Sequence, residues 1–412
     1  VTGVQTCALP IYLTVQPLEK GGIILEHTFD ALVVGAGYAG SVCARQLAEG
    51  GKRVLVLERR DHIGGNAYDR LDRAGVLIHQ YGPHIFHTNN KRVFDWLSRF
   101  TVWRDYQHRV LANIPDGQGG RQTYPVPFNL TSLETAFGPA EGARLGQKLI
   151  AAYGAEKKVT ILELRQARDP EIAALADYVY EHVFVHYTMK QWGQTPEEID
   201  PNTTARVPVF LSRDDRYFQD TYQGMPLEGY TALFQRMLDH PGITVELGTD
   251  ALKRLDLSGG QTRLDGTAFS GPVIYTGQAD ELFGFRFGPL PYRTLDFRFE
   301  TLEQDDFQGC GTVNYTMDED YTRITEFKHL TGQVRPGVTT IVKEYSRAFT
   351  GAPGEIPYYA IINPENDRRY AQYRAEAERF PNLYLLGRLA EYKYYNMDAI
   401  ASRALELAGL LT

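Results

Sequence analysis

Short apolar runs and helical patterns alternate along most of the chain. Residues 29–34 and 53–58 are rich in Val and Leu, and each run predicts a buried parallel strand. The segment between them carries apolar residues at helical spacing, and the runs at 243–247, 273–276 and 382–387 predict further strands. We therefore expect a strand–helix–strand unit near residue 30 and a sheet that collects strands from distant parts of the chain.

Two other regions have different patterns. Residues 130–195 show helical periodicity, as do 91–100, 229–238 and the segment from 397 onward. In contrast, residues 292–345 alternate between apolar and polar positions, which is typical of a half-exposed antiparallel sheet. A helical region and an antiparallel sheet thus interrupt the parallel α/β pattern.

The composition excludes several classes of protein. The net charge of −8 argues against a nucleic-acid-binding protein, which usually has a basic balance. No apolar run approaches 18 residues, so we expect no membrane span. Cys7, Cys43 and Cys310 are odd in number and far apart, so we expect neither a disulfide framework nor a metal site, and a cytoplasmic location.

Residues 1–28 differ from the rest of the chain. They begin with Val and contain no basic stretch before an apolar one, so we do not expect a signal peptide. We interpret them as an extraneous or disordered N-terminal segment, with a native N-terminal strand as the alternative. Removal of residues 1–25 should leave folding and activity intact.

A glycine-rich motif comes directly after the first predicted strand. Gly35, Gly37 and Gly40 form a G-x-G-x-x-G pattern that leads into the predicted helix, and Glu58 ends the next strand. Glycines at this spacing allow the backbone and a helix N-terminus to approach a pyrophosphate, while the acid accepts hydrogen bonds from a ribose. The pattern predicts a dinucleotide site, and a chance glycine turn is the alternative.

The residues after Glu58 indicate which dinucleotide binds. Gly64, Gly65 and Asn66 come after a basic pair, and the stretch resembles the second phosphate loop of FAD proteins of the glutathione-reductase and amine-oxidase type. The resemblance favours FAD over a nicotinamide cofactor. Arg59, or Arg60 beside it, could lie over the adenine.

We therefore predict a mixed α/β (α+β) fold with a Rossmann-like FAD-binding domain, an inserted helical domain and an antiparallel β-sheet domain. The FAD-binding domain is discontinuous and comprises residues 29–105, 222–290 and 362–412. Residues 106–200 form the helical domain that binds substrate. Residues 201–221 and 291–361 form the sheet domain, which includes a mobile loop around Arg206.

Several longer segments together resemble the bacterial UDP-galactopyranose mutases. The similar segments are GGNAY at 64–68, YGPHIFHT at 81–88, YTMKQWG at 187–193, RVPV at 206–209, YFQDTYQGMP at 217–226, YTRI at 321–324, PYY at 357–359 and GRLAEYKYYNM at 387–397. The resemblance extends from about residue 29 to near the C-terminus. It implies an isomerase that interconverts UDP-galactopyranose and UDP-galactofuranose without net redox change, in which N5 of reduced FAD attacks the anomeric carbon and displaces UDP.

The resemblance also implies roles for individual residues. Arg206 and Arg323 would bind the diphosphate, Arg206 from a mobile loop, and His84 and His87 would lie against the flavin. The histidines are not expected to bind metal, because no Cys or acid stands nearby in the sequence. Residues implied in substrate binding are Tyr187 and Trp192 at the uridine, Phe184 and Asn314 as weaker companions, Tyr217, Tyr359 and Tyr394 near the diphosphate and sugar, and Asn396. Arg388 and Met397 are implied in cofactor binding.

Some of these assignments have structural alternatives. Phe184 could be a core aromatic, as could Trp192, and each tyrosine or histidine could be buried for packing alone. Many relatives carry Asp where this chain has Asn396, so a sugar-hydroxyl contact is favoured over proton transfer there.

Two other functions remain possible on the sequence alone. The chain could be another FAD-dependent oxidoreductase of the amine-oxidase superfamily, or a non-catalytic protein that binds flavin or a UDP-sugar. For the mutase we expect UDP-galactose in both ring forms, an unidentified reductant (NAD(P)H or a flavin system) and a homodimer as partners, and a role in making galactofuranose for cell-wall glycans.

Overall fold

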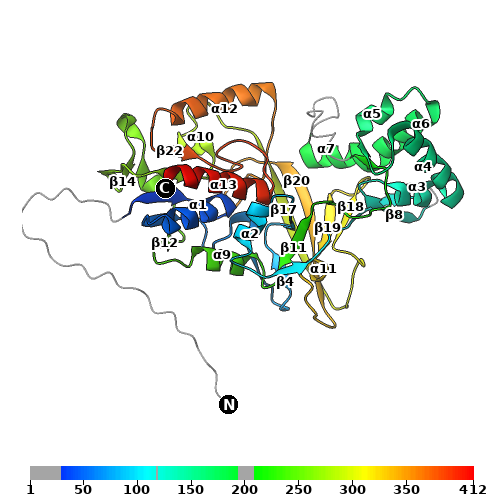
Figure 1. The fold of residues 1–412 in the computed structure, drawn as a ribbon, viewed down its shortest axis with the longest axis horizontal. Helices are drawn as coiled ribbons and strands as arrows, with labels where there is room; N and C mark the ends of the chain where they lie inside the picture. Colours follow the sequence, from blue (N-terminus) through cyan, green and yellow to red (C-terminus); the bar gives the residue numbers. More distant parts are fainter. Residues whose placement is uncertain (1–28, 117–118, 194–207) are drawn as a thin grey trace, which may run out of the picture.

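The computed structural model describes residues 29–116, 119–193 and 208–412. Figure 1 shows three regions along the long axis of the molecule: a parallel sheet with helices at one end, a helical region at the other, and a large sheet between them. This arrangement agrees with the predicted mixed α/β class and its three kinds of region.

The parallel sheet has five strands in the order β12-β2-β1-β16-β22, and every neighbouring pair is parallel. Its strands are β1 (Ala31–Val34), β2 (Val54–Leu57), β12 (Ile243–Glu246), β16 (Val273–Tyr275) and β22 (Leu383–Leu385). Strands β1, β2 and β16 are buried almost throughout because both faces of the sheet are covered. Helices α1 (Tyr38–Glu49) and α13 (Met397–Leu411) pack together in one of the two cores beside this sheet.

The large sheet has seven strands in the order β21-β17-β20-β19-β18-β7-β8. They are β7 (Val110–Pro115), β8 (Arg121–Val126), β17 (Tyr292–Leu302), β18 (Thr312–Tyr315), β19 (Arg323–Glu326), β20 (Thr339–Ala348) and β21 (Tyr359–Ala360). All pairs are antiparallel except β18 with β7. The antiparallel sheet predicted over 292–345 is therefore present.

Two predicted boundaries differ from the structure. The predicted helical domain includes residues 110–115 and 121–126, but they form β7 and β8 of the large sheet. The reason is visible in β7, where buried Val110, Ala112 and Ile114 alternate with half-exposed residues, a period of two that is typical of a strand. Strand β10 (Val209–Phe210) pairs with β9 (Lys158–Val159) of the helical region and not with the large sheet.

The helical region contains α3 (Leu130–Phe137), α4 (Pro139–Tyr153), α5 (Ile161–Arg165), α6 (Pro170–Val179), the π-helix η2 (Tyr180–Val185) and α7 (His186–Trp192). The starts of these helices obey local rules. Asn129 caps α3 by accepting a hydrogen bond from Ser132 N, and Asp169 caps α6 ahead of Pro170 in its first turn. The continuous run from α6 through η2 to α7 carries the segment predicted to bind the base.

Smaller elements connect these regions. They are β3 (Asp69–Leu71), β4 (Leu77–His79), β5 (Phe86–Thr88), α2 (Lys91–Leu97), β6 (Trp103–Asp105), β11 (Tyr222–Pro226), α9 (Tyr230–Leu238), β13 (Leu255–Asp256), β14 (Arg263–Leu264), β15 (Thr267–Ala268), α10 (Ala279–Leu282), α11 (Phe327–Thr331), α12 (Pro364–Ala377) and the short 3-10 turns η1 (Gly65–Ala67), η3 (Ala251–Lys253) and η4 (Ser258–Gly260). Within the three described ranges, no helix combines the length and apolar character needed to cross a bilayer.

Candidate functional site

A cavity of about 1220 Å³ lies beside the parallel sheet. Its walls come from the loops that come after β1, β2, β16 and β22 and from the 349–357 loop of the large sheet. In parallel α/β sheets ligands bind beyond the carboxyl ends of the strands, which is where this cavity lies. The predicted cofactor residues that line it are Gly35, Gly37, Glu58, Arg59, Gly64, Gly65, Asn66, Arg388 and Met397, together with His84.

The glycines form a cradle in which only backbone fits. A Cβ atom on Gly65 would lie 2.9 Å from the Cα of Gly37, so the two glycine loops touch backbone to backbone. Gly40 does not line the cavity. A Cβ atom at this position would lie 1.9 Å from the carbonyl oxygen of Gly35, so Gly40 allows α1 to pack closely against the turn.

Glu58 holds this turn from the opposite side. It is 7% exposed, and its two carboxylate oxygens accept hydrogen bonds from Ala36 N (2.7 Å) and Arg60 N (2.9 Å). Each oxygen retains a further lone pair on the cavity wall, which fits the predicted contact with ribose hydroxyls.

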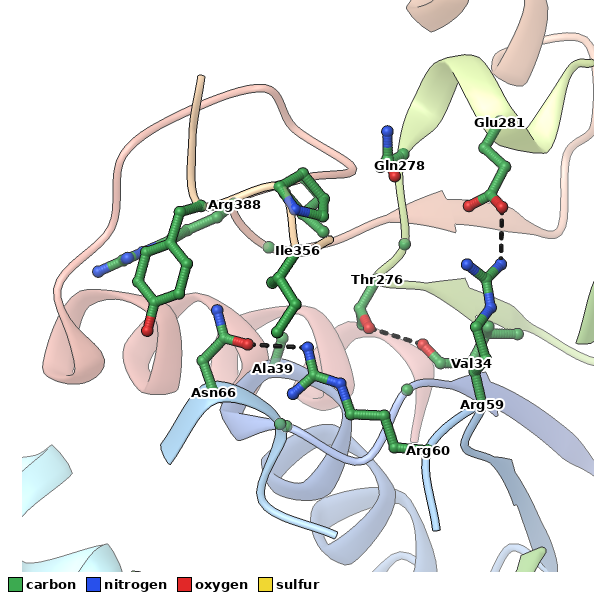
Figure 2. Close-up of a pocket in the computed structure, with 18 of the residues that line it drawn as sticks. Val34, Ala39, Arg59, Arg60, Asn66, Thr276, Gln278, Glu281, Ile356 and Arg388 are labelled. Carbon is green, nitrogen blue, oxygen red and sulfur yellow. Dashed lines mark hydrogen bonds and ion pairs between the residues drawn. The ribbon is translucent and has the colours of Figure 1, made fainter. Parts of the chain in front are cut away.

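Two neighbouring arginines point in different directions (Figure 2). Arg59 forms ion pairs with Glu281 at 2.9 Å and with Asp250 at 3.5 Å. Arg60 donates a hydrogen bond to Asn66 Oδ1 at 2.9 Å, and its guanidinium lies 4.5 Å from the centroid of the Tyr81 ring. Its Nη1 is buried without a hydrogen-bond partner. A buried cationic donor without a partner, beside two glycine loops, fits an anionic dinucleotide.

The far end of the cavity contains His84 and Arg388. Burial, with a smaller effect from His79, lowers the pKa of His84 to about 3, so the ring is neutral. Nδ1 of His84 lies 2.9 Å from the carbonyl oxygen of Gly82, which makes Nδ1–H the donor and Nε2 the acceptor. Arg388 donates to Tyr395 O at 2.7 Å, and its guanidinium lies 4.6 Å from the Tyr394 ring.

Next to this end, Arg323 is the centre of a second cluster. It lies on β19, and its Nε donates to Glu344 Oε1 on β20 at 2.7 Å. The Glu344 side chain is only 1% exposed, whereas that of Arg323 is 26% exposed. Asn314 stands directly opposite Arg323 on β18, so the two side chains share one face of the sheet.

Tyrosines surround this arginine. The charge of Arg323 acts on Tyr187, Tyr217 and Tyr359, and Tyr359 stacks with Tyr394 at a centroid distance of 6.2 Å. Burial raises the pKa of Tyr359 to about 12, and burial also raises the pKa of Tyr187 and Tyr217. These hydroxyls therefore stay protonated and can donate hydrogen bonds to an anion bound at Arg323.

The helix that carries Tyr187 is fixed at its C-terminal end. Arg293 on β17 donates to the carbonyl oxygens of Gln191 (3.2 Å) and Lys190 (3.3 Å), the last turn of α7. The Lys190 ammonium donates to Tyr315 O at 2.6 Å at the end of β18 and to Glu319 O at 3.0 Å in the loop between β18 and β19. These contacts bind α7 to the sheet that carries Arg323.

Several residues that were predicted to bind substrate lie in surroundings that differ from those of the Arg323 cluster. Phe184 is 3% exposed within the core of the helical region, which is the structural alternative. Tyr187 and Trp192 both belong to α7. Asn396 is exposed at the N-cap of α13, and its side chain makes no capping hydrogen bond. Arg206 lies outside the described residues.

The sequence did not reveal the partners of these side chains. Glu344, Tyr358 and His108 were not singled out, although Tyr358 lines the cavity and donates to Tyr81 O. His87 is paired with Asp220, another residue that was not predicted. Tyr358 and Asp220 lie within two of the recognised motifs, but the residues they contact are distant in sequence, and no local pattern marks the pairing.

The described ranges contain one group of side chains suited to a metal: Asp306, Glu326 and His329, with ligand atoms within 4.8 Å of one another. Glu326 is fully buried, but its oxygens already accept hydrogen bonds from Phe307 N, Gln308 N and Thr339 Oγ1. None of the three residues lines the cavity, and Asp306 and His329 line a separate surface hollow.

The fold and the cavity define a Rossmann-type nucleotide-cofactor enzyme with an adjoining cationic, tyrosine-rich site. Residues 33–100 match the family model of the NAD(P)-binding Rossmann-like domain, and residues 182–394 match the model described as GLF, UDP-galactopyranose mutase. The chain belongs to the UDP-galactopyranose mutase family, as its sequence motifs predicted.

Individual relatives agree with this assignment. The chain is 35% identical to a dTDP-fucopyranose mutase of Escherichia coli, covering 92% of this chain and 97% of that protein. It is 36% identical to a probable UDP-galactopyranose mutase of Klebsiella pneumoniae, covering 92% and 93%. The crystal structure of a reduced UDP-galactopyranose mutase superimposes with a TM-score of 0.66 at 16% identity, covering 92% of this chain and 93% of that one, which shows the shared fold.

Proposed function

We propose that this chain is an FAD-dependent UDP-galactopyranose mutase that interconverts UDP-galactopyranose and UDP-galactofuranose. The observation that carries the proposal is Arg323, paired with buried Glu344 and surrounded by tyrosines, beside the His84 end of a dinucleotide cavity. A guanidinium and several neutral hydroxyls suit a nucleoside diphosphate leaving group, because all of them can donate hydrogen bonds to phosphate oxygens. The negative charge of Glu344 is already paired with Arg323.

The residues of the chain divide the work between two sites. Gly35, Gly37, Gly64, Gly65 and Arg60 hold the pyrophosphate of FAD, and Glu58 binds a ribose. Bound and reduced FAD supplies the nucleophile that displaces UDP from the sugar. Arg323 stabilises the negative charge that develops on UDP, and Tyr187, Tyr217, Tyr359 and Tyr394 orient its phosphates and the sugar. Neutral His84 accepts hydrogen bonds at the junction of the two sites.

The remaining parts of the proposal rest on the family resemblance. Arg206 contributes the second diphosphate contact, Trp192 and Tyr187 bind the uracil, and Asn396 binds a sugar hydroxyl. The enzyme acts in the cytoplasm as a homodimer, and a nicotinamide or flavin system reduces its FAD.

A paired assay tests this function. Purified protein is incubated with UDP-galactofuranose, once with dithionite and once in air, and the nucleotide sugars are separated chromatographically. We expect UDP-galactopyranose only in the reduced sample. No conversion by flavin-loaded protein in either sample would contradict the proposal, and consumption of oxygen with net oxidation of a substrate would favour an oxidoreductase.

A second nucleotide sugar belongs in the same assay. The E. coli relative, a dTDP-fucopyranose mutase, shares 35% sequence identity with this chain, and the Klebsiella protein shares 36%. Faster turnover of dTDP-fucofuranose than of UDP-galactofuranose would keep the mutase reaction but change the substrate.

A further inference from the structure

The ring of His87 is held from two sides. Its Nδ1 lies 2.9 Å from Asp220 Oδ2, and the Phe218 ring stacks on it at a centroid distance of 3.5 Å and an interplanar angle of 11°. His87 lies on β5, and the Asp220 segment leads directly into β11, where Gln223 is the strand partner of His87. Both the position and the plane of the imidazole are thus fixed by one neighbouring segment.

Asp220 is itself fixed by a network of hydrogen bonds. Its other carboxylate oxygen accepts from Asn89 Nδ2 at 2.9 Å, and Asn89 Oδ1 accepts from Thr221 N at 2.9 Å. The Gln223 amide donates to the carbonyl oxygens of Phe218 (3.1 Å) and Asp220 (2.9 Å). The Asp220 side chain is 23% exposed, so this carboxylate is partly shielded from water. This arrangement costs little reorganisation when a ligand binds.

The pair borders the Arg323 cluster. His87 comes three positions after the cavity residue His84, and Phe218 packs edge-on against Tyr217 at 4.9 Å. The buried His108 ring lies 5.7 Å from Tyr217, and the charge of Arg323 acts on it. His87 is therefore close in sequence to the cavity residue His84 and is connected through Phe218 to Tyr217, one of the residues proposed to bind the nucleotide sugar.

We propose that Asp220 is a positioning residue that fixes the tautomer and orientation of His87. A carboxylate only accepts hydrogen bonds, so Nδ1 of His87 carries the proton, and in the neutral ring Nε2 is left with its lone pair. Nε2 has no hydrogen-bond partner among the described residues, and it serves as the acceptor for a hydroxyl group of the nucleotide sugar. The identity of the ligand in this inference rests on the proposed mutase function. The geometry of the His87–Asp220 pair does not depend on that function.

The chain offers a matched control. On the surface away from the cavity, His329 Nε2 lies 2.8 Å from Asp306 Oδ2, another histidine–aspartate pair. The variants are Asp220→Ala, which removes the acceptor, Asp220→Glu, which restores a carboxylate, and Asp306→Ala. His87→Gln identifies the His87 signals and provides the background for a double variant.

The experiment measures tautomers and kinetics in flavin-loaded protein. Ring ¹⁵N–¹H correlation spectra of ¹⁵N-histidine-labelled protein report the protonated nitrogen, while kcat, KM, UDP affinity and flavin content are measured in parallel. We expect His87 to be protonated at Nδ1 in the parent and Asp220→Glu proteins and to lose that preference in Asp220→Ala. We expect kcat to fall about ten- to a hundredfold in Asp220→Ala, with flavin content and UDP affinity unchanged and no effect of Asp306→Ala.

Two results would overturn the inference. One is an unchanged His87 tautomer in Asp220→Ala. The other is a loss of kcat that is as large in the His87→Gln background as in the parent, because Asp220 would then act independently of His87. If the parent protein converts no nucleotide sugar, the mutase function fails, while the tautomer spectra still decide whether Asp220 positions His87.

Discussion

Replacing Arg323 by alanine should have two separable effects, one on turnover and one on stability. A guanidinium that contacts a diphosphate makes charge-assisted hydrogen bonds, each of which contributes about 1.5–3 kcal/mol. Two such bonds lost from the transition state correspond to about 3–6 kcal/mol. Since about 1.4 kcal/mol equals a tenfold change in rate, we expect kcat to fall at least about a hundredfold.

The stability effect comes from Glu344. Without Arg323 this carboxylate, which is 1% exposed, loses its ionic partner. Breaking a buried ion pair costs about 3–5 kcal/mol, and we expect the lower end because the Arg323 side chain is 26% exposed and water can enter the space it leaves. The double variant Arg323→Ala/Glu344→Gln removes the charge and should recover most of this loss.

The assay combines urea unfolding with initial rates of the reduced enzyme. Arg323→Ala should lower the free energy of unfolding by about 3 kcal/mol, and the double variant should be close to the parent protein, with both variants equally slow. Arg323→Lys serves as the control that keeps a charge without the planar fork. Near-normal rates of flavin-loaded Arg323→Ala would refute the assigned role, and a double variant as unstable as the single one would refute the electrostatic explanation.

Three further predictions concern other regions. Arg206→Ala should lower kcat at least about a hundredfold without loss of flavin, and an unchanged rate would exclude its diphosphate contact. Gly40→Ala should yield protein with little flavin, measured by the ratio of flavin to protein absorbance, because its Cβ would meet Gly35 O at 1.9 Å, whereas Gly409→Ala, with no atom within 4 Å, should retain flavin. Burial lowers the pKa of His79 to about 4 and of His84 to about 3, below the value of about 6.5 in an unfolded chain, so their neutral rings add stability above pH ~6.5 that is lost as the pH falls toward 4. The free energy of unfolding should therefore be about 2 kcal/mol lower per histidine at about pH 5 than at about pH 7.5. A loss of this pH dependence in the double variant His79→Gln/His84→Gln, but not in the parent protein, would support this origin.

The parallel sheet was predictable because its signals are local. Strand β1, the glycine motif, α1 and β2 succeed one another within a short stretch of chain, and each carries its own pattern. Strands β7 and β8 were not predicted, and their residues were included in the helical domain, because a short alternating pattern does not say which sheet a strand joins. The pairing of β7 with β18 joins Val110 to Thr312, residues that are far apart in the sequence.

The candidate site shows the same limit. Arg323 and the tyrosines were predicted from motifs, but Glu344 was not, since it reaches Arg323 through the register of β19 and β20. Similarly, Asp220 meets His87 across a sequence separation of 133 residues. The π-helix before α7 has no simple sequence signal, yet it leads directly into the helix that carries Tyr187.

The order of strands in the parallel sheet has a consequence for folding during synthesis on the ribosome. The first two strands emerge early, but β22 at Leu383–Leu385 completes the sheet, and Arg388 and Met397 complete the cavity wall. A nascent chain therefore cannot form the whole cofactor site until almost all of its 412 residues have been synthesised. Long-range pairing of this kind folds slowly and leaves strand edges unprotected in the meantime. A premature stop codon before β22 would thus release a chain that contains the glycine loops after β1 and β2 but lacks part of the cavity wall.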